Sequence, residues 1–287
     1  MNKCITVFTP TYNRCHTLPK LYESLCSQTN KNFCWLVVDD GSSDGTEELI
    51  SSWASERKIE IVYVKQENRG KSMAFNKGVS LCKTELFTCV DSDDYLTSDA
   101  IDLILLTWSD SADDCVGILG LREVSSVPEK LLKIELYTTL RDAYCIHGLK
   151  GDTMLIHKTD IIKKYQFPSF DGEKFVPEDY LYDKIDHDGK LKFLCKVLYR
   201  GVYQNDGYTR NMAKLIKNNP RGYNAFITQR LLYDQSIKLK VLDTIRHIAI
   251  NQVLKSGGYK TNIVYPILYY LLYPLGFLFY IQRYKYI

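Results

Sequence analysis

Residues 86–94, Leu-Phe-Thr-Cys-Val-Asp-Ser-Asp-Asp, place a short apolar run directly before a polar tetrad that contains three carboxylates. A short apolar run bounded by polar residues is typical of a buried strand. Repulsion among Asp91, Asp93 and Asp94 at a strand end would be costly unless a cation or hydrogen-bond donors compensated it. Such oxygen ligands suit Mg²⁺ or Mn²⁺, which commonly bind carboxylates together with substrate phosphate oxygens. The alternative is a capping cluster before a helix that begins near Ser98.

Strand and helix patterns alternate on both sides of this stretch. Apolar or β-branched runs predict strands over residues 4–9, 35–39, 60–65, 86–90 and 116–121. Helical spacing of apolar residues predicts helices over residues 18–25, 46–54, 71–81 and 98–108. Nearly continuous apolar strands that alternate with helices are typical of parallel βαβ units, covered on both faces. The fold predicted from residue 4 to about residue 121 is therefore an open α/β sheet.

Polar loops follow four of the predicted strands. Because ligands bind beyond the carboxyl ends of the strands in such sheets, we expect these loops to meet at one edge. The carboxylates of Asp39 and Asp40 could accept the imide N–H of uracil, with Pro10 and Tyr12 as walls for the base. The alternative for the Asp39–Asp40 pair is a turn that caps the following helix.

Arg69, Gly70 and Lys71 open the predicted helix over residues 71–81. Backbone N–H groups at a helix start, together with two cations, suit a diphosphate. An ordinary surface helix terminus is the alternative.

A second acidic site, the pair Glu178 and Asp179, follows far beyond the tetrad in the sequence. Transfer to a hydroxyl needs a carboxylate that takes the proton of the acceptor while a metal stabilises the departing diphosphate, and two separated sites fit that chemistry. Either residue could instead cap a helix over residues 180–185. His147 and His157 form no metal pattern with each other, so we interpret them as structural. No GxSxG, P-loop lysine or GxGxxG motif is present, which excludes the corresponding hydrolase, kinase and dinucleotide-binding classes.

Composition indicates a globular protein, with 287 residues, 45% hydrophobic and 25% charged. The nine cysteines form no CxxC pair and are expected to be reduced structural thiols. The first apolar run is too short for a signal-peptide core, so a cytoplasmic catalytic domain is expected.

The C-terminal part is basic, with 12 Lys plus Arg against 3 Asp plus Glu in residues 201–287. It ends in a run over residues 263–281 that lacks any charge and contains five tyrosines. Prolines, glycine and tyrosines favour a segment that lies at the surface of the cytoplasmic membrane leaflet. A buried aromatic hairpin or a homodimer contact is the alternative. No nucleic-acid partner is expected.

The motifs TPTYNR, VVDDGSSDGT, ENRGKSMAFNKG and VDSDDYL, in this order and spacing, closely resemble the N-terminal half of glycosyltransferase family 2, which has the GT-A fold. The strong resemblance covers residues 4 to about 121. GEKFVPEDYLYDKI looks like a later segment of bacterial polysaccharide-synthesis members and extends the resemblance to about residue 205.

The resemblance implies a role for each motif. Pro10, Tyr12 and Asp40, with Asp39 nearby, would hold the nucleotide base. The tetrad would bind ribose and metal through Asp91, Ser92 and Asp93, with Asp93 as the stronger candidate for Mn²⁺ or Mg²⁺. Glu178 or Asp179 falls at the position of the catalytic base, and the sequence does not choose between them.

The expected activity is an inverting transfer from a nucleotide-linked sugar, such as a UDP-sugar, to a saccharide or lipid-linked acceptor. Its expected setting is the synthesis of a bacterial capsule, O-antigen or exopolysaccharide. Residues 1–205 would form the catalytic domain, divided into a nucleotide-sugar half (1–121) and an acceptor half (122–205). Residues 206–287 would form a basic helical extension with a membrane-interface tail at 262–287.

Two other classes of function remain open. A non-catalytic sugar-nucleotide or membrane-binding module would share the fold. A nucleotidyltransferase would normally need a glycine-rich basic loop after the first strand, and TPTYNRCHT contains no glycine.

Overall fold

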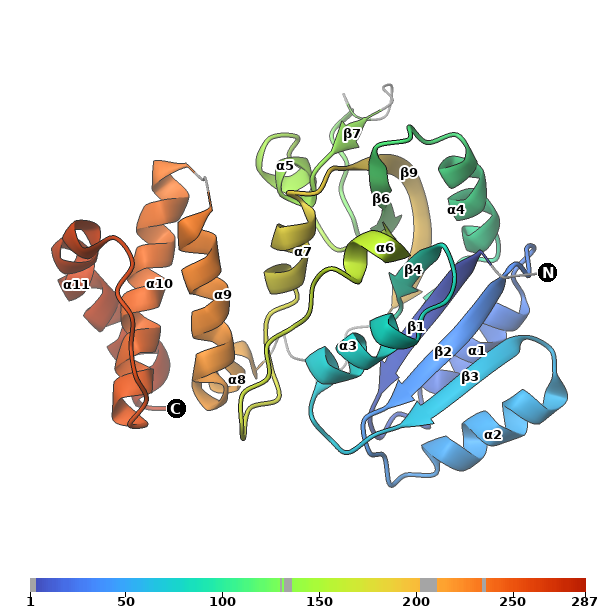
Figure 1. The fold of residues 1–287 in the computed structure, drawn as a ribbon, viewed down its shortest axis with the longest axis horizontal. Coiled ribbons are helices and arrows are strands. Elements are labelled where there is room, and N and C mark those ends of the chain that lie inside the picture. Colours follow the sequence, from blue (N-terminus) through green and yellow to red (C-terminus); the bar gives the residue numbers. More distant parts are fainter. Residues whose placement is uncertain (1–3, 130, 132–135, 202–210, 234–235) are drawn as a thin grey trace. The chain divides into compact units, whose positions relative to one another are not determined.

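The computed structural model describes residues 4–129, 131, 136–201, 211–233 and 236–287 (Figure 1). The chain forms two compact units. Unit 1 comprises Met1–Gln166 and Leu181–Tyr203, and unit 2 comprises Phe167–Tyr180 and Gln204–Ile287. The predicted boundary at residues 205 and 206 lies outside the described residues. The division differs from the prediction in one segment, since Phe167–Tyr180 groups with the C-terminal helices.

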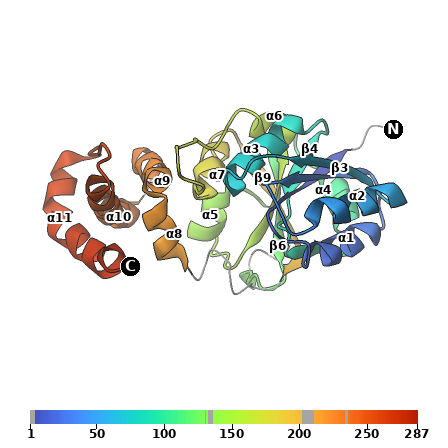
Figure 2. The same ribbon diagram turned by 90° about the horizontal axis from the view of Figure 1, so that it is seen from below.

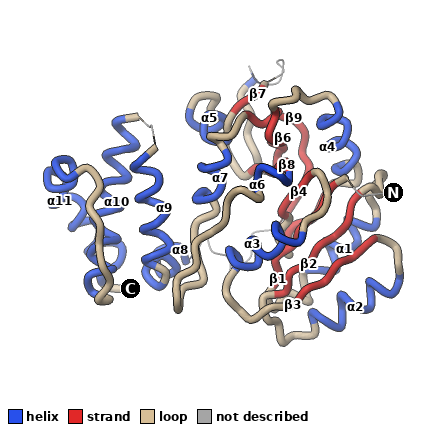
Figure 3. The backbone as a smooth tube through the Cα atoms, viewed as in Figure 1, coloured by secondary structure: helices blue, strands red, loops and turns tan. Residues whose placement is uncertain are grey.

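Unit 1 is built on one mixed sheet, to which nine strands of the described residues contribute, in the order β3-β2-β1-β4-β8-β6-β9-β5 with β7 paired to β9 (Figure 3). The strands are β1 (Ile5–Thr11), β2 (Phe33–Asp39), β3 (Glu60–Lys65), β4 (Leu86–Cys89), β5 (Asp94–Leu96), β6 (Cys115–Arg122), β7 (Tyr137–Thr138), β8 (Thr153–Lys158) and β9 (Lys190–Gly201). Its helices are α1 (Leu18–Cys26), α2 (Thr46–Glu56), α3 (Lys71–Leu81), α4 (Ala100–Ser109), α5 (Leu140–Cys145) and α6 (Thr159–Ile162).

The α/β prediction is confirmed, and each of the five predicted strands and four predicted helices has its counterpart. The neighbours β3, β2, β1 and β4 are parallel. Beyond β4 the sheet departs from the expected parallel order, because β8 inserts between β4 and β6 and is antiparallel to both. Four strands, β5, β7, β8 and β9, were not predicted from the sequence.

One face of the sheet is covered by α1, α2 and α4 (Figure 2). Tyr22 of α1 stacks on Trp53 of α2 with ring centroids 4.4 Å apart, and Trp35 of β2 lies 6.1 Å from both rings. Burial of large aromatic side chains is a major contribution to core stability. These rings therefore fix α1 and α2 on the strands whose carboxyl ends carry the polar loops.

The opposite face is covered by α3, with α6 on the same side (Figure 2). Phe75 of α3 makes edge-to-face contacts with Phe8 and Phe87, at centroid distances of 5.6 and 5.5 Å. Gly78 allows the close approach, since a Cβ there would lie 2.4 Å from the ring of Phe8. The helix that begins at Lys71 is thus anchored on β1 and β4.

Unit 2 contains α8 (Met212–Asn218), α9 (Pro220–Leu232), α10 (Ile237–Ser256), α11 (Pro266–Tyr280) and a π-helical turn over Ile281–Lys285, and no strand appears among its described residues (Figure 3). The α10 helix packs against both α9 and α11. The predicted basic helical extension is therefore helical, and its aromatic run forms α11. Along residues 4–129, 131, 136–201, 211–233 and 236–287, we find no helix long and apolar enough to cross a bilayer.

Polar contacts explain why Phe167–Tyr180 groups with unit 2. Glu173 accepts hydrogen bonds from the backbone N–H groups of Arg221 and Gly222 and forms an ion pair of 3.0 Å with the Arg221 guanidinium. The side-chain oxygen of Asn219 accepts from the backbone N–H of Lys174 at 2.7 Å. The segment thus satisfies donors at the start of α9, a position where backbone N–H groups lack helical partners.

Candidate active site

The predicted polar loops follow the carboxyl ends of four adjacent parallel strands. Thr11 pairs with Asp39 between β1 and β2, and Asp39 pairs with Lys65 between β2 and β3. Phe8 pairs with Cys89 between β1 and β4, so the loop after β4 lies beside the loop after β1. The expected meeting of these loops at one sheet edge is confirmed within unit 1.

Direct hydrogen bonds join the loops after β1 and β2. The backbone N–H of Asn13 donates to Ser42 Oγ at 2.8 Å, and the N–H of Ser43 donates back to Asn13 Oδ1 at 2.9 Å. Asn13 has a positive φ of 51°, which asparagine tolerates better than most residues. Beside this junction Tyr12 is 48% exposed and Pro10 is buried in β1. Tyr12 is therefore an exposed aromatic residue at the sheet edge.

Asp44 strengthens the same junction. Its carboxylate accepts from the backbone N–H of Cys15 at 3.0 Å and from the Thr46 hydroxyl at 2.6 Å. Burial alone would raise the pKa of Asp44, but hydrogen bonds from Thr46 and Cys15 outweigh it and lower the pKa to about 2. The charged carboxylate thus links the β1 loop to the start of α2.

Asp39 is fully buried at the end of β2. It accepts from the backbone N–H of Ser42 at 2.8 Å and from the Tyr63 hydroxyl at 2.7 Å. Burial, followed by the hydrogen bond to Asp39, raises the pKa of Tyr63. Asp39 therefore supports the turn after β2, as the turn interpretation expected.

Asp40 instead fixes the loop that leads into α3. Its carboxylate accepts from the backbone N–H groups of Arg69 and Gly70, at 2.9 and 2.7 Å, and from the Gln66 side chain at 2.8 Å. Gly70 has a φ of 89°, a conformation that favours glycine. Asp40 therefore positions the predicted phosphate loop, and its contact with a base stays a prediction.

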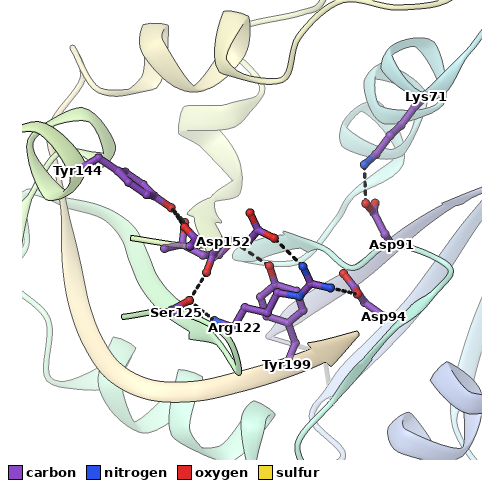
Figure 4. Close-up of polar contacts among 10 residues, drawn as sticks. Lys71, Asp91, Asp94, Arg122, Ser125, Tyr144, Asp152 and Tyr199 are labelled. Atoms are coloured by element: carbon purple, nitrogen blue, oxygen red, sulfur yellow. Dashed lines mark hydrogen bonds and ion pairs between the residues drawn. The ribbon is translucent and has the colours of Figure 1, made fainter. Parts of the chain in front are cut away.

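Lys71 is the first residue of α3 and lies against the acidic tetrad. Its Nζ is 2.7 Å from Asp91 Oδ2, with the two side chains 25% and 41% exposed (Figure 4). The predicted start of α3 is confirmed. The ion pair brings together the phosphate-loop candidate and the tetrad, two motifs that are 20 residues apart in the sequence.

The three carboxyl groups of the tetrad differ in environment. Burial, followed by the negative charge of Asp91, raises the pKa of Asp93. The same two causes raise the pKa of Asp94 to about 7. Ser92 is buried beside them. The tetrad is not a helix cap, because Asp94 starts β5 and α4 begins at Ala100 after a cap residue at Asp99.

Arg122, at the end of β6, carries the buried cation of this region. Its guanidinium lies 2.6 Å from Asp152 Oδ2 and 3.4 Å from Asp94 Oδ1 (Figure 4). It also lies over the ring of Tyr199, 5.8 Å from the centroid. Burial, followed by the charge of Asp94, raises the pKa of Tyr199. Arg122 is the ion-pair partner of Asp94, but burial and the charge of Asp91 outweigh it and keep the pKa of Asp94 raised.

Arg122, Asp152 and Gly201 were not singled out from the sequence. One signal was available, since Arg122 ends the apolar run of β6 and a buried arginine is rare without an acidic partner. The partner Asp152 stands after the turn at Gly148–Gly151, where no motif indicates its role. Gly201 leaves room for the pair, because a Cβ there would lie 1.6 Å from Asp94 Oδ1.

Glu178 and Asp179 belong to unit 2, at the start of α7 (Asp179–Ile185), a helix that crosses the division between the units. Asp179 is the first residue of α7 and lies in its first turn. The assignment of a base to Glu178 or Asp179 stays a prediction. His157 is buried in β8, in line with a structural role. In the part of the chain that the structure describes, no three His, Cys, Asp or Glu side chains are grouped as a metal site.

Comparisons with known proteins agree with this architecture. The family model described as Glycosyl transferase family 2 matches residues 6–161, more than half of the 287 residues. GlyA, a glycosyltransferase of Streptococcus pneumoniae serotype 4, is 39% identical over 100 residues, which are 35% of this chain and 14% of GlyA. Hyaluronan synthase of Pasteurella multocida is 26% identical over 225 residues, 75% of this chain and 22% of the synthase. The chain thus spans a small part of these relatives.

Solved structures show the same fold. TarS 1–349 of S. aureus, solved with UDP-GlcNAc, has a TM-score of 0.59 at 18% identity and covers 88% of this chain and 73% of its own. The mannosyltransferase PcManGT of Pyrobaculum calidifontis, solved with GDP-Man and Mn²⁺, has a TM-score of 0.59 at 15% identity. The match covers 99% of this chain and 84% of the PcManGT chain. Unit 1 thus has the GT-A fold of a transferase. The chain belongs to glycosyltransferase family 2.

Proposed function

We propose that this glycosyltransferase uses a nucleotide diphosphate sugar, with a UDP-sugar as the first choice, and inverts the anomeric centre on transfer to a hydroxyl of a saccharide or lipid-linked acceptor. The single observation that supports it most is the meeting of the Tyr12, Asp40, Lys71 and Asp91 loops at one sheet edge of unit 1. Those four loops supply an aromatic face, an acceptor for a base, a cation and carboxylates within one region.

The donor is assigned to the loops after β1, β2 and β3. Tyr12 stacks on the base, and Asp40 accepts from the imide N–H while it holds the loop of Arg69 and Gly70. The start of α3, with Arg69 and Lys71, faces the diphosphate, because a helix start favours negative charge. TarS and PcManGT were solved with UDP-GlcNAc and GDP-Man, which supports a nucleotide-sugar donor in general.

The acidic tetrad fits a divalent cation, Mn²⁺ or Mg²⁺. Asp94 is paired with the buried Arg122, so Asp93 is the first candidate ligand, and Asp91, which is partly exposed beside Lys71, is the second. Mg²⁺ and Mn²⁺ commonly combine one or two carboxylates with phosphate oxygens, so a set of two carboxylates fits. When bound, such an ion stabilises the negative charge of the leaving diphosphate.

Glu178 or Asp179 is assigned as the general base. In the proposed step the acceptor hydroxyl oxygen forms a bond to the anomeric carbon, the bond from that carbon to the diphosphate breaks, and the hydroxyl proton passes to the carboxylate. Attack opposite the leaving group inverts the configuration. The most fitting setting is the synthesis of a bacterial capsule, O-antigen or exopolysaccharide, in line with the polysaccharide synthase among the relatives.

The Asp93→Asn variant tests the donor and metal assignments together. Thermal unfolding is measured with a panel of UDP- and GDP-sugars, with and without Mn²⁺, because a ligand that binds the native state raises its stability. We expect metal-dependent protection by one nucleotide class in the wild type and its loss in Asp93→Asn. Asp99→Asn, a change at an exposed residue in front of α4, is the matched control. Intact metal-dependent protection and transfer in Asp93→Asn would remove Asp93 from the metal assignment.

A further inference from the structure

The α11 helix of unit 2 has two apolar faces, and only one of them is buried. Tyr269 and Gly276 pack against α10, where a Cβ at position 276 would lie 2.4 Å from Ile248. The other face exposes Ile267, Tyr270, Leu271, Leu275 and Leu278, which we name the α11 surface. These positions follow the i, i+3, i+4 spacing of one helix face. Ile267 and Leu271 are 89% and 73% exposed, and the other three residues are each more than half exposed.

Single exposed apolar residues are ordinary, but a contiguous exposed patch marks an interaction site. The α11 surface is continuous over the 15 residues of the helix, which contain no charged side chain. Neighbouring segments add Tyr265 and Tyr286, 40% and 80% exposed. Tyrosine is enriched where one end of a side chain is apolar and the other is wet, as at a membrane–water interface.

Charge indicates the kind of partner. Residues 244–287 contain five Lys plus Arg and no Asp or Glu. Arg283 and Lys285 directly follow α11, and their cations lie 6.0 and 5.3 Å from the ring centroids of Phe279 and Tyr286. A basic side chain that lies along apolar groups with its charge in water is the arrangement that suits a lipid headgroup region. A second copy would bring the same positive segment to this surface.

Length decides how the helix would meet a bilayer. At ~1.5 Å per residue, α11 is roughly 22 Å long, shorter than the ~30 Å hydrocarbon core. Pro274 and Gly276 lie inside the helix, and its contact with α10 occupies one side. A helix that is attached along one side and apolar along the other can lie in the plane of the interface.

We propose that the α11 surface binds in the interfacial layer of a membrane that contains anionic lipids, with Arg283 and Lys285 among the headgroups. Ile267, Leu271 and Leu278 enter the acyl boundary, and α10 holds the helix parallel to the membrane plane. This surface goes beyond the proposed sugar transfer and does not depend on the donor, the metal or the base.

Co-sedimentation of the full chain with vesicles tests the surface. Vesicles of neutral phosphatidylcholine are compared with vesicles that contain phosphatidylglycerol as the anionic lipid. We expect binding to the anionic vesicles, a decrease as salt rises, and at least a tenfold loss in the double variant Leu271→Glu/Leu275→Glu. Leu106→Glu is the matched control, because Leu106 is a 60% exposed leucine on α4 of unit 1.

Arg283→Gln and Lys285→Gln should each weaken binding to anionic vesicles roughly fivefold, and binding to neutral vesicles less.

Thermal unfolding and nucleotide binding of the same variants separate this proposal from the proposed function. Variants that bind nucleotide as the wild type does but lose vesicle binding support the α11 surface. Equal vesicle binding by Leu271→Glu/Leu275→Glu and the wild type overturns it. Absence of vesicle binding by the wild type, with a dimer in solution that the double variant dissociates, assigns the surface to a second copy and also overturns the proposal.

Discussion

Lys71 Nζ lies 2.7 Å from Asp91 Oδ2, so the first residue of α3 is paired with the first carboxylate after β4. The two side chains are partly exposed, and pairs of this kind contribute at most about 1 kcal/mol to stability. A lysine at a helix start beside carboxylates is placed for negative phosphate oxygens. The pair therefore adds little to stability, and the proposed phosphate contact of Lys71 can be tested without loss of the fold.

Lys71→Met should weaken nucleotide diphosphate binding roughly 10- to 100-fold, the range expected for loss of one charged hydrogen bond. Its unfolding free energy should change by less than about 1 kcal/mol. Titration calorimetry with UDP and Mn²⁺ measures the affinity, and thermal unfolding measures stability. Lys65→Met is the matched control, because Lys65 forms an exposed 2.8 Å pair with Glu47. Equal affinities in the two variants would contradict a phosphate role for Lys71.

Gly201→Ala should destabilise unit 1 by about 1–3 kcal/mol, the usual cost of forcing an extra carbon into packed structure. The new Cβ would lie 1.6 Å from Asp94 Oδ1 and 2.8 Å from Arg122 Nη2, so the ion pair must shift. In an Asp94→Ala background the clash with Asp94 Oδ1 is absent, so Gly201→Ala should lower the unfolding free energy by less. A double-mutant cycle from chemical denaturation measures this coupling. Additive effects of the two changes would show that Gly201 does not serve the Asp94–Arg122 pair.

The buried His157 should lower the unfolding free energy as the pH falls below 6.5, an effect that the raised pKa of Asp94 opposes. Burial lowers the pKa of His157 from its ordinary 6.5 to about 4, and neither ring nitrogen has a hydrogen-bond partner among the described residues. Below pH 6.5 the unfolded chain therefore binds a proton that the folded chain does not bind until the pH nears 4. This group contributes stability at neutral pH, and about 3 kcal/mol of it is lost across that window.

His157→Phe should flatten the decline in unfolding free energy over that pH range. The decline is measured by denaturant unfolding at a series of pH values. His16→Asn, a change at an exposed histidine in unit 1, should leave the slope unchanged. A slope in His157→Phe equal to that of the wild type would show that His157 does not cause the acid sensitivity.

Part of the fold was predictable because its central strands are unusually apolar. The β1 strand is buried at all seven positions. Its run of apolar and β-branched residues therefore predicts a strand without any knowledge of the strands that pair with it. By contrast, β9 carries Lys190, Lys196 and Arg200 and is partly exposed. These charged residues interrupt its apolar pattern, so the sequence does not indicate a strand there. The insertion of β8 between β4 and β6 depends on tertiary pairing that no local pattern encodes.

The same distinction holds for the site. Asp39, Asp40, Lys71 and the tetrad follow strand ends, so knowledge of the strands places them at one edge. The ion pairs of Arg122 join β6 to β5 and to the turn before β8, segments that are about 30 residues away in the chain. Local spacing cannot predict such a contact. The distinct roles of Asp39 and Asp40 likewise arise from side chains and backbone groups that only the fold brings near them.

The sequence left open whether Glu178 or Asp179 is the base, and separate Glu178→Gln and Asp179→Asn variants distinguish them. Removal of a general base typically costs ~10²- to 10⁴-fold in rate. The base variant should therefore lose kcat in that range, with nucleotide affinity unchanged, because the carboxylate acts on the acceptor. Steady-state transfer kinetics and titration calorimetry give the two quantities. Glu173→Gln is the control for a folding defect. Glu173 binds Arg221 and Gly222 at the start of α9, so this variant should lower the unfolding free energy instead of kcat. Retention of kcat within about threefold in both variants would move the base out of this segment, because a base on either carboxylate requires a larger loss.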